Sequence, residues 1–288
     1  MQLEFGLFLS SFILHQEPRL LLSIGLPVSM TFSSPVIIVT GASRGIGLAV
    51  VGALLKSYKA RVVTLSRTRT PELSALVSEH GDNLAPLEGD VTKEQSAIAA
   101  VDLAKSKFGR LDGLILNAGT LDPLGRIDSP ESSVESWKSM FDVNLFSLVH
   151  LIKAGLPLLR ESHGRVIFVS SGAANGGIAA WGPYSASKAA MNSLARTLAN
   201  EEKDIVSVAV RPGVVDTEMQ SIIRAKGTAS MKPEEHDKFI TLHAQSQLVK
   251  PEDTGHVIAG LSVGAKPELS GAFVDWQSDE VKEFRRKE

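Results

Sequence analysis

The sequence predicts an α/β protein: a single domain with one doubly wound, mostly parallel sheet of about seven strands and helices on both faces. Three observations predict this fold. Continuous runs rich in Val and Ile, typical of strands buried on both faces, alternate with amphipathic segments of helical length. The order strand then helix repeats about six times, which is the pattern of parallel sheets. A glycine-rich turn joins the first strand to the first helix, and no linker or repeat interrupts residues 35–288.

The first element is the run Val36-Ile37-Ile38-Val39-Thr40, which Gly41 ends, and the helix that follows it has an apolar face from Ile46 to Leu55. Later apolar runs and helical patterns continue the alternation. The predicted strands are 36–40, 61–66, 84–88, 111–117, 165–170, 205–211 and 272–274. The predicted helices are 46–57, 71–80, 92–108, 133–160, 184–201 and 251–261.

Three smaller expectations complete the predicted elements. Thr92, with Gln95 three residues later, is expected to cap the third helix. Residues 218–241 follow the Pro212-Gly213 turn and are expected to form a mobile lid over the substrate, although an ordinary surface helix pair is the alternative. The charged residues 280–288 are expected to fray.

The composition excludes several classes of protein. The 288 residues include no cysteine, which excludes disulfides, thiolate metal sites and a cysteine nucleophile. Thirty basic and 32 acidic residues give a net charge of −2, so no nucleic-acid partner is expected. The seven histidines lack metal-ligand spacing, and no metal is expected.

Residues 1–34 are expected to be a disordered or weakly helical extension outside the fold, unless Met30 is the true start. The apolar stretches 3–14 and 20–28 both fall short of the roughly 18 continuous apolar residues of a membrane span, so none is expected. A loose membrane-surface anchor is a third, weaker alternative. Acidic Glu4 and the shortage of arginine oppose a secretory signal and a transit peptide, and we expect a cytoplasmic protein.

The turn TGASRGIG at 40–47 predicts a dinucleotide site. Gly41 permits a sharp exit from the strand, Gly45 lets the backbone approach a pyrophosphate, and Gly47 allows close helix packing. The free N–H groups at the start of the helix form an anion site. A plain tight turn is the alternative, but the place of the turn after a buried strand favours a cofactor.

The end of the second strand indicates which dinucleotide binds. An acid near Ser66 would hold the ribose 2′-OH of NAD, but the sequence there continues as Arg67-Thr68-Arg69. Arginines at this position and in the turn, at Arg44, suit a 2′-phosphate, since guanidinium groups fork onto phosphate oxygens. We therefore predict NADP(H), against the alternative of ordinary solvated arginines.

Tyr184 and Lys188 lie four residues apart at the start of a helix, so their side chains share one face. A tyrosine hydroxyl titrates near pH 10, and a nearby cation would lower its pKa enough for acid–base work. Ser171, at the end of the preceding strand, is expected to point into the same crevice. The tyrosine–lysine pair alone is weak evidence for a catalytic site. It becomes strong evidence only in combination with the glycine turn and Ser171.

These motifs together resemble the short-chain dehydrogenase/reductase family from about residue 35 to the end. The matches occur in the family order and are TGASRGIG at 40–47, Asp90-Val91, Asn117-Ala118-Gly119, Asn144 in DVNLF, Ser170-Ser171, YSASK at 184–188 and RPGVVDT at 211–217. PGVVDTEMQ at 212–220 and LSGAFVDW at 269–276 are similar to the fungal benzil reductase and sepiapterin reductase-like group.

The resemblance implies a Rossmann domain and a role for each catalytic residue. Tyr184 would protonate the carbonyl oxygen, while Lys188 would lower the pKa of Tyr184 and hold the nicotinamide ribose. Ser171 would hydrogen-bond the substrate oxygen, and Asn144 would support a water that links Lys188 to solvent. The turn, the strand ends and the resemblance together give the expected cofactor-binding residues. They are Gly41, Ser43, Arg44, Gly45, Ile46, Gly47, Ser66, Arg67, Asp90, Val91, Asn117, Ala118, Gly119, Tyr184, Lys188, Pro212, Gly213, Val214 and Thr217.

The predicted function is an NADPH-dependent carbonyl reductase that acts on a small ketone or diketone, with apolar or aromatic substrates favoured if Trp181 and Met219 face the pocket. The resemblance also implies a homodimer or homotetramer. Two alternatives are a non-catalytic regulator that senses NADP(H) and an oxoacyl-thioester reductase. The regulator would not need all four catalytic residues, and the thioester reductase would need a basic surface for its acidic carrier.

Overall fold

The structure is a computed structural model that describes residues 34–287. Residues from Ser34 onward form one compact unit. The predicted extension at 1–34 lies outside the described residues, except for Ser34.

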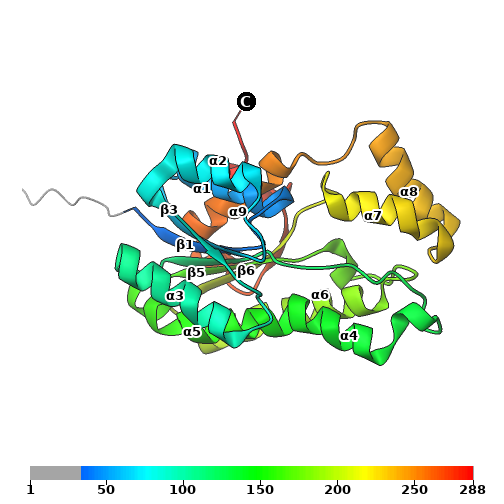
Figure 1. Cartoon of the computed structure of the whole chain (residues 1–288), viewed down its shortest axis with the longest axis horizontal. Helices are drawn as coiled ribbons and strands as arrows, with labels where there is room; N and C mark the ends of the chain where they lie inside the picture. The colour runs from blue at the N-terminus through cyan, green and yellow to red at the C-terminus, as the bar shows by residue number, and fades with distance from the viewer. Residues whose placement is uncertain (1–33, 288) are drawn as a thin grey trace, which may run out of the picture. The chain divides into compact units, whose positions relative to one another are not determined.

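Seven strands form a single, entirely parallel sheet, as predicted (Figure 1). Their continuous Val and Ile runs suit strands that are covered on both faces. The strands are β1 Val36–Thr40, β2 Arg61–Ser66, β3 Leu84–Glu88, β4 Gly113–Leu116, β5 Arg165–Val169, β6 Val206–Arg211 and β7 Phe273–Asp275. Their order across the sheet is β3-β2-β1-β4-β5-β6-β7.

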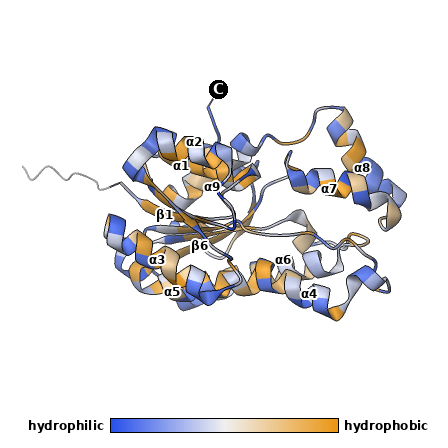
Figure 2. Cartoon of the chain, viewed as in Figure 1, coloured by the Kyte–Doolittle hydropathy of each residue, from blue (hydrophilic) through white to orange (hydrophobic). Residues whose placement is uncertain are grey.

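Helices cover both faces of this sheet (Figure 1). One face carries α1 Gly45–Lys56, α2 Pro71–His80 and α9 Pro251–Gly264. The other carries α3 Glu94–Phe108, α5 Ser147–Ser162 and α6 Gly182–Glu201. Apolar side chains fill the two layers between sheet and helices, and the outer sides of the helices are largely polar (Figure 2).

The remaining helices lie near the carboxyl ends of the strands. A helical run from α4 Val134–Phe141 passes through a π-helical turn, Asp142–Phe146, into α5. Helices α7 Glu218–Lys226 and α8 Pro233–Ala244 project beyond the sheet (Figure 1), and we call residues 218–244 the lid. Residues 218–241 therefore contain a helix pair, and the expected mobility of this segment stays a prediction.

The strand order reverses between β1 and β4, which are neighbours although two strands separate them in sequence. In a doubly wound sheet this switch point opens a crevice at the carboxyl ends of the strands. Gly41 follows β1 and Asn117 follows β4, so the predicted cofactor turn stands at this crevice.

Two expectations about helix ends are wrong. Thr92 does not cap α3, because its N–H is held by the Asp90 carboxylate (2.9 Å) in a turn, and Lys93 precedes the first helical residue. The charged carboxyl-terminal segment does not fray before residue 284: Asp279–Phe284 forms a 3₁₀ helix. Val281 and Phe284 are buried in the core cluster that includes α9. Charged residues surround both in the sequence, so the local pattern does not indicate a buried segment.

By length and composition alone, the helical run 134–162 could cross a membrane. In this fold, apolar residues of the run pack against the sheet. Leu148, Leu151 and Leu159 of α5 are buried in the layer against the sheet. Core packing therefore accounts for much of the hydropathy of this run.

Candidate active site

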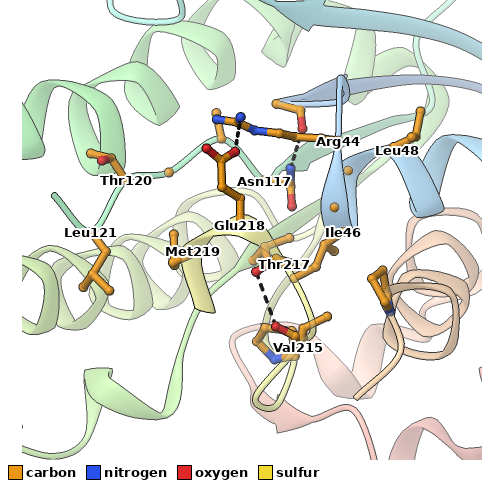
Figure 3. Close-up of a pocket in the computed structure, with 18 of the residues that line it drawn as sticks. Arg44, Ile46, Leu48, Asn117, Thr120, Leu121, Val215, Thr217, Glu218 and Met219 are labelled. Atoms are coloured by element: carbon orange, nitrogen blue, oxygen red, sulfur yellow. Dashed lines mark hydrogen bonds and ion pairs between the residues drawn. The ribbon is translucent and has the colours of Figure 1, made fainter. Parts of the chain in front are cut away.

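A cleft of about 1980 Å³ opens at the carboxyl ends of the strands. Every residue expected in the site lines this cleft, with the exception of Asn144, which is completely buried behind it. Figure 3 shows the part between the glycine turn and the beginning of the lid. The fold thus brings together residues from almost every loop on this edge of the sheet.

The glycine turn has the shape that a dinucleotide requires. Gly41 has a φ of +65°, and a Cβ there would lie 2.9 Å from the Ala118 Cα. A Cβ at Gly47 would collide with the Gly41 carbonyl oxygen. Arg44, the residue before α1, makes no side-chain cap, and no acid lies in the first turn of the helix. The first N–H groups of α1 are therefore available to a phosphate, and the residues fit a bound dinucleotide.

Two residues expected to touch the cofactor also brace this turn. The Asn117 amide nitrogen donates hydrogen bonds to the carbonyl oxygens of Thr40 (2.9 Å) and Gly41 (3.1 Å). The Ser66 hydroxyl accepts a hydrogen bond from the Ala42 N–H (2.9 Å). These side-chain oxygens and nitrogens fix the turn against β2 and β4.

Arg67 and Asp90 lie at the end of the cleft formed by β2 and β3. Arg67 is exposed on the cleft wall. The N–H of Thr92 donates to the Asp90 carboxylate and lowers the pKa of Asp90, and the charge of Arg67 adds a small contribution. This end therefore presents a guanidinium beside an ionised carboxylate.

Tyr184 is the third residue of α6 and is buried in the wall of the cleft. Burial raises the pKa of its hydroxyl, and a hydrogen bond with the Ser171 side chain partly offsets this rise. The expectation that a cation lowers the pKa of Tyr184 therefore differs from what this structure shows, because desolvation has the larger effect. The hydroxyl is therefore protonated at neutral pH, and its raised pKa makes it a weaker acid than an ordinary tyrosine.

Lys188 lies one turn after Tyr184 on the same helix face, as the spacing predicts. Its ammonium group donates to the Val169 carbonyl oxygen (2.8 Å) at the end of β5. Burial lowers the pKa of Lys188 to about 8. The lysine is thus a buried cation within reach of proton exchange near neutral pH.

Asn144 lies in the π-helical turn, which places its side chain in the interior. Its Oδ1 accepts a hydrogen bond from the Thr120 N–H (2.8 Å). Its Nδ2 donates to the Thr120 carbonyl oxygen (2.9 Å) and to the Ser187 hydroxyl (3.1 Å). Sequence reasoning missed Thr120 and Ser187, since backbone groups and a plain serine carry no motif of their own.

The other half of the cleft is apolar and partly aromatic. Trp181 lies edge-on to Tyr184, with ring centroids 5.5 Å apart, and stacks on Phe239 of α8 at 5.6 Å. Further apolar side chains from loops, α4 and the lid complete this cluster. They include Leu121, Met140, Ile178, Met219, Ile222 and Ile223. Trp181 and Met219 do line the cleft, the condition under which the sequence favours an apolar substrate.

Polar contacts hold the lid to three separate parts of the chain. Glu218 forms an ion pair with Arg44 of the glycine turn (Figure 3). Lys226 pairs with Asp122 (3.1 Å) in the loop after β4. Glu235 accepts a hydrogen bond from the Ala179 N–H (3.0 Å) in the loop before α6. The lid thus closes over the apolar half of the cleft.

No group of three or more His, Asp or Glu residues that could hold a metal ion is found in residues 34–287.

Comparison with known proteins identifies the family. Residues 35–227 match the family described as short chain dehydrogenase. The chain belongs to this family of oxidoreductases, which act on CH–OH or carbonyl groups with NAD(P)(H). The matched residues include the glycine turn, Asn144, Ser171, Tyr184 and Lys188.

Individual relatives are similar over nearly their whole length. An uncharacterized oxidoreductase of Schizosaccharomyces pombe is 44% identical over 244 residues, which cover 84% of this chain and 96% of that protein. A Saccharomyces cerevisiae benzil reductase that forms (S)-benzoin is 36% identical and covers 85% of this chain and 97% of its own length. The crystal structure of a short chain dehydrogenase/reductase from S. cerevisiae superposes with a TM-score of 0.84 at 35% identity. That match covers 88% of this chain and all of the other.

Proposed function

We propose that this protein is an NADPH-dependent carbonyl reductase that converts a ketone or diketone to an alcohol, with Tyr184 as the proton donor. One observation carries the proposal. The Tyr184 hydroxyl, hydrogen-bonded by Ser171, lies in the wall of the same cleft that holds the glycine turn and an apolar pocket. A proton donor, a dinucleotide cradle and an apolar substrate surface are the three parts that carbonyl reduction needs.

A bound reduced nicotinamide supplies the hydride that adds to the carbonyl carbon. The carbon–oxygen double bond becomes a single bond, and negative charge develops on the oxygen. Ser171 hydrogen-bonds this oxygen and stabilises its charge, and Tyr184 transfers its proton to it. Lys188 stabilises the tyrosinate that remains, because the buried ammonium shares a helix face with it.

Buried groups behind the site support the return of the proton. Asn144 binds Thr120 and Ser187, and Ser187 donates to the Tyr184 carbonyl oxygen (2.8 Å). Asn144 thus fixes the first turn of α6 from behind. In the proposed mechanism it also supports the water through which Lys188 is reprotonated from solvent.

Two features support NADPH over NADH. Arg67 is exposed on the cleft wall where β2 ends, and Arg44 stands at the start of α1. Both guanidinium groups carry the charge that a 2′-phosphate attracts, and no acid occupies the end of β2.

The aromatic wall supports a flat, apolar carbonyl compound as the substrate. The Trp181 ring lies beside Tyr184 and stacks on Phe239, both rings line the cleft, and a relative of 36% identity is a benzil reductase. A benzil-like diketone, with aromatic rings beside its carbonyl groups, suits this wall. The proposal also includes a cytoplasmic location and a homodimer or homotetramer.

The test measures cofactor absorbance while the purified full chain is offered NADPH or NADH with benzil, a quinone, a pterin ketone or an acetoacetyl thioester. We expect NADPH oxidation with the diketone and little with NADH. Turnover of the thioester alone would replace the proposal by an oxoacyl-thioester reductase. Tight NADPH binding without turnover across a broad carbonyl panel would make the protein a regulator.

A further inference from the structure

The ion pair between Arg44 and Glu218 spans the mouth of the cleft. Arg44 belongs to the glycine turn, and Glu218 is the first residue of α7 (Figure 3). The side chains are 65% and 54% exposed, so water weakens the attraction between them. Among residues 34–287, neither side chain has another hydrogen-bond or ion-pair partner.

Arg44 therefore has two possible anionic partners. In this structure its guanidinium faces a carboxylate on the lid, and it is also one of the two guanidinium groups that the proposed function assigns to the 2′-phosphate. A guanidinium N–H group that faces a carboxylate cannot donate to a phosphate at the same time. A phosphate dianion attracts the guanidinium more strongly than one exposed carboxylate does, so the exchange weakens phosphate binding without preventing it.

We propose that Glu218 is a built-in competitor for Arg44 that lowers the affinity for a 2′-phosphorylated dinucleotide and leaves the affinity for the unphosphorylated one unchanged. The inference rests on the proposed use of NADPH. It makes Glu218 a selectivity-determining residue that the glycine-turn motif does not contain. Because Glu218 begins the lid, loss of the pair also frees the first residue of α7 when the 2′-phosphate binds.

The test compares the Kd values of NADPH and NADH, measured by fluorescence titration without substrate, for the full-length wild type and Glu218→Gln. We expect Glu218→Gln to bind NADPH about two- to fivefold more tightly, the range for release from an exposed ion pair, with NADH unchanged. Glu234→Gln, which removes an exposed acid from α8, is the matched control and should change neither value.

The Arg44→Ala background separates competition from simple repulsion. There, adding Glu218→Gln should no longer tighten NADPH binding, because the contested guanidinium is gone. If Glu218→Gln tightens both cofactors equally, or still acts without Arg44, the carboxylate only repels phosphates and the inference is wrong. An unchanged NADPH affinity in Glu218→Gln would also overturn it.

The wild type distinguishes this failure from failure of the proposed function. If it binds NADPH more tightly than NADH but Glu218→Gln has no effect, only the competition is wrong. If it binds the two cofactors equally, the proposed NADPH preference fails and this inference fails with it.

Discussion

The Lys188 ammonium nitrogen lies 5.7 Å from the centre of the Tyr184 ring. The carbonyl oxygen of Val169, at the end of β5, holds it there through a hydrogen bond. Helix α6 thus supplies both the proposed proton donor and its cation, while the sheet fixes the position of the cation. Loss of the Tyr184 hydroxyl or of the Lys188 ammonium group alone should therefore disrupt the proposed mechanism.

Removal of the Tyr184 hydroxyl tests the proton donor. Tyr184→Phe should reduce kcat by about a hundred- to ten-thousandfold, the usual contribution of a positioned acid, with little change in NADPH affinity. Steady-state kinetics and fluorescence titration measure the two effects. The other tyrosine, Tyr58, packs against His256 and provides a matched control, since Tyr58→Phe should keep its activity. Near wild-type turnover in Tyr184→Phe would exclude the mechanism.

Burial of Lys188 predicts a pH dependence of stability. The folded pKa of about 8 lies below the ordinary value of 10.5, so between these pH values the unfolded chain binds more protons at this site. The destabilising cost of the buried charge is fully present below pH 8 and is relieved as the pH rises toward 10.5. Lys188→Met removes this cost.

From pH 7 to pH 10, the free energy of unfolding of the wild type should therefore rise by about 2 kcal/mol relative to that of Lys188→Met. Urea unfolding at both pH values measures it. Lys203→Met, at an exposed position, provides the control and should show little shift. A difference that does not vary with pH would mean that Lys188 titrates normally.

Arg67 tests the preference for NADPH. Arg67→Ala should raise the Kd of NADPH by about ten- to a hundredfold through loss of a charge-assisted contact to phosphate, with a much smaller effect on NADH. Arg69 lies two residues further along, bonds Ser74 (3.2 Å) and does not line the cleft, so Arg69→Ala is the control. Equal losses for both cofactors would remove the argument for NADPH.

Phe239 tests the aromatic wall. Phe239→Ala removes the ring stacked on Trp181 and should lower kcat/KM for a diaryl diketone by about tenfold, while a small aliphatic diketone is affected much less. The neighbouring Ile240 is 40% exposed, and Ile240→Ala should leave both substrates unaffected. A uniform loss for both diketones would indicate general damage to the lid instead of lost substrate contact.

The sequence predicts the sheet well because its strands are short, continuous runs of apolar residues. Val36–Thr40, for example, is completely enclosed, and its composition reflects that burial directly. The site residues at strand ends were also predictable, since parallel strands place their carboxyl ends together. The placements of Gly41, Asn117 and Ser171 along the cleft follow from this rule.

Other features depend on contacts that no local pattern encodes. The π-helical turn at Asp142–Phe146 changes the helical period by one residue and carries Asn144 inward, although its sequence looks like ordinary helix. The pairing of Arg44 with Glu218 joins opposite sides of the cleft, and only the folded chain shows it. Tyr184 differs from expectation for a similar reason, because its pKa depends on how deeply its neighbours bury it.

The switch point between β1 and β4 divides the sheet into segments from the two halves of the sequence. The cleft takes its walls from both, with Gly41 on one side and Thr217 on the other. A molecule bound there links parts of the chain that meet only through folding. Its binding energy should therefore oppose separation of the two halves, raise the melting temperature of the whole unit and slow cleavage by proteases.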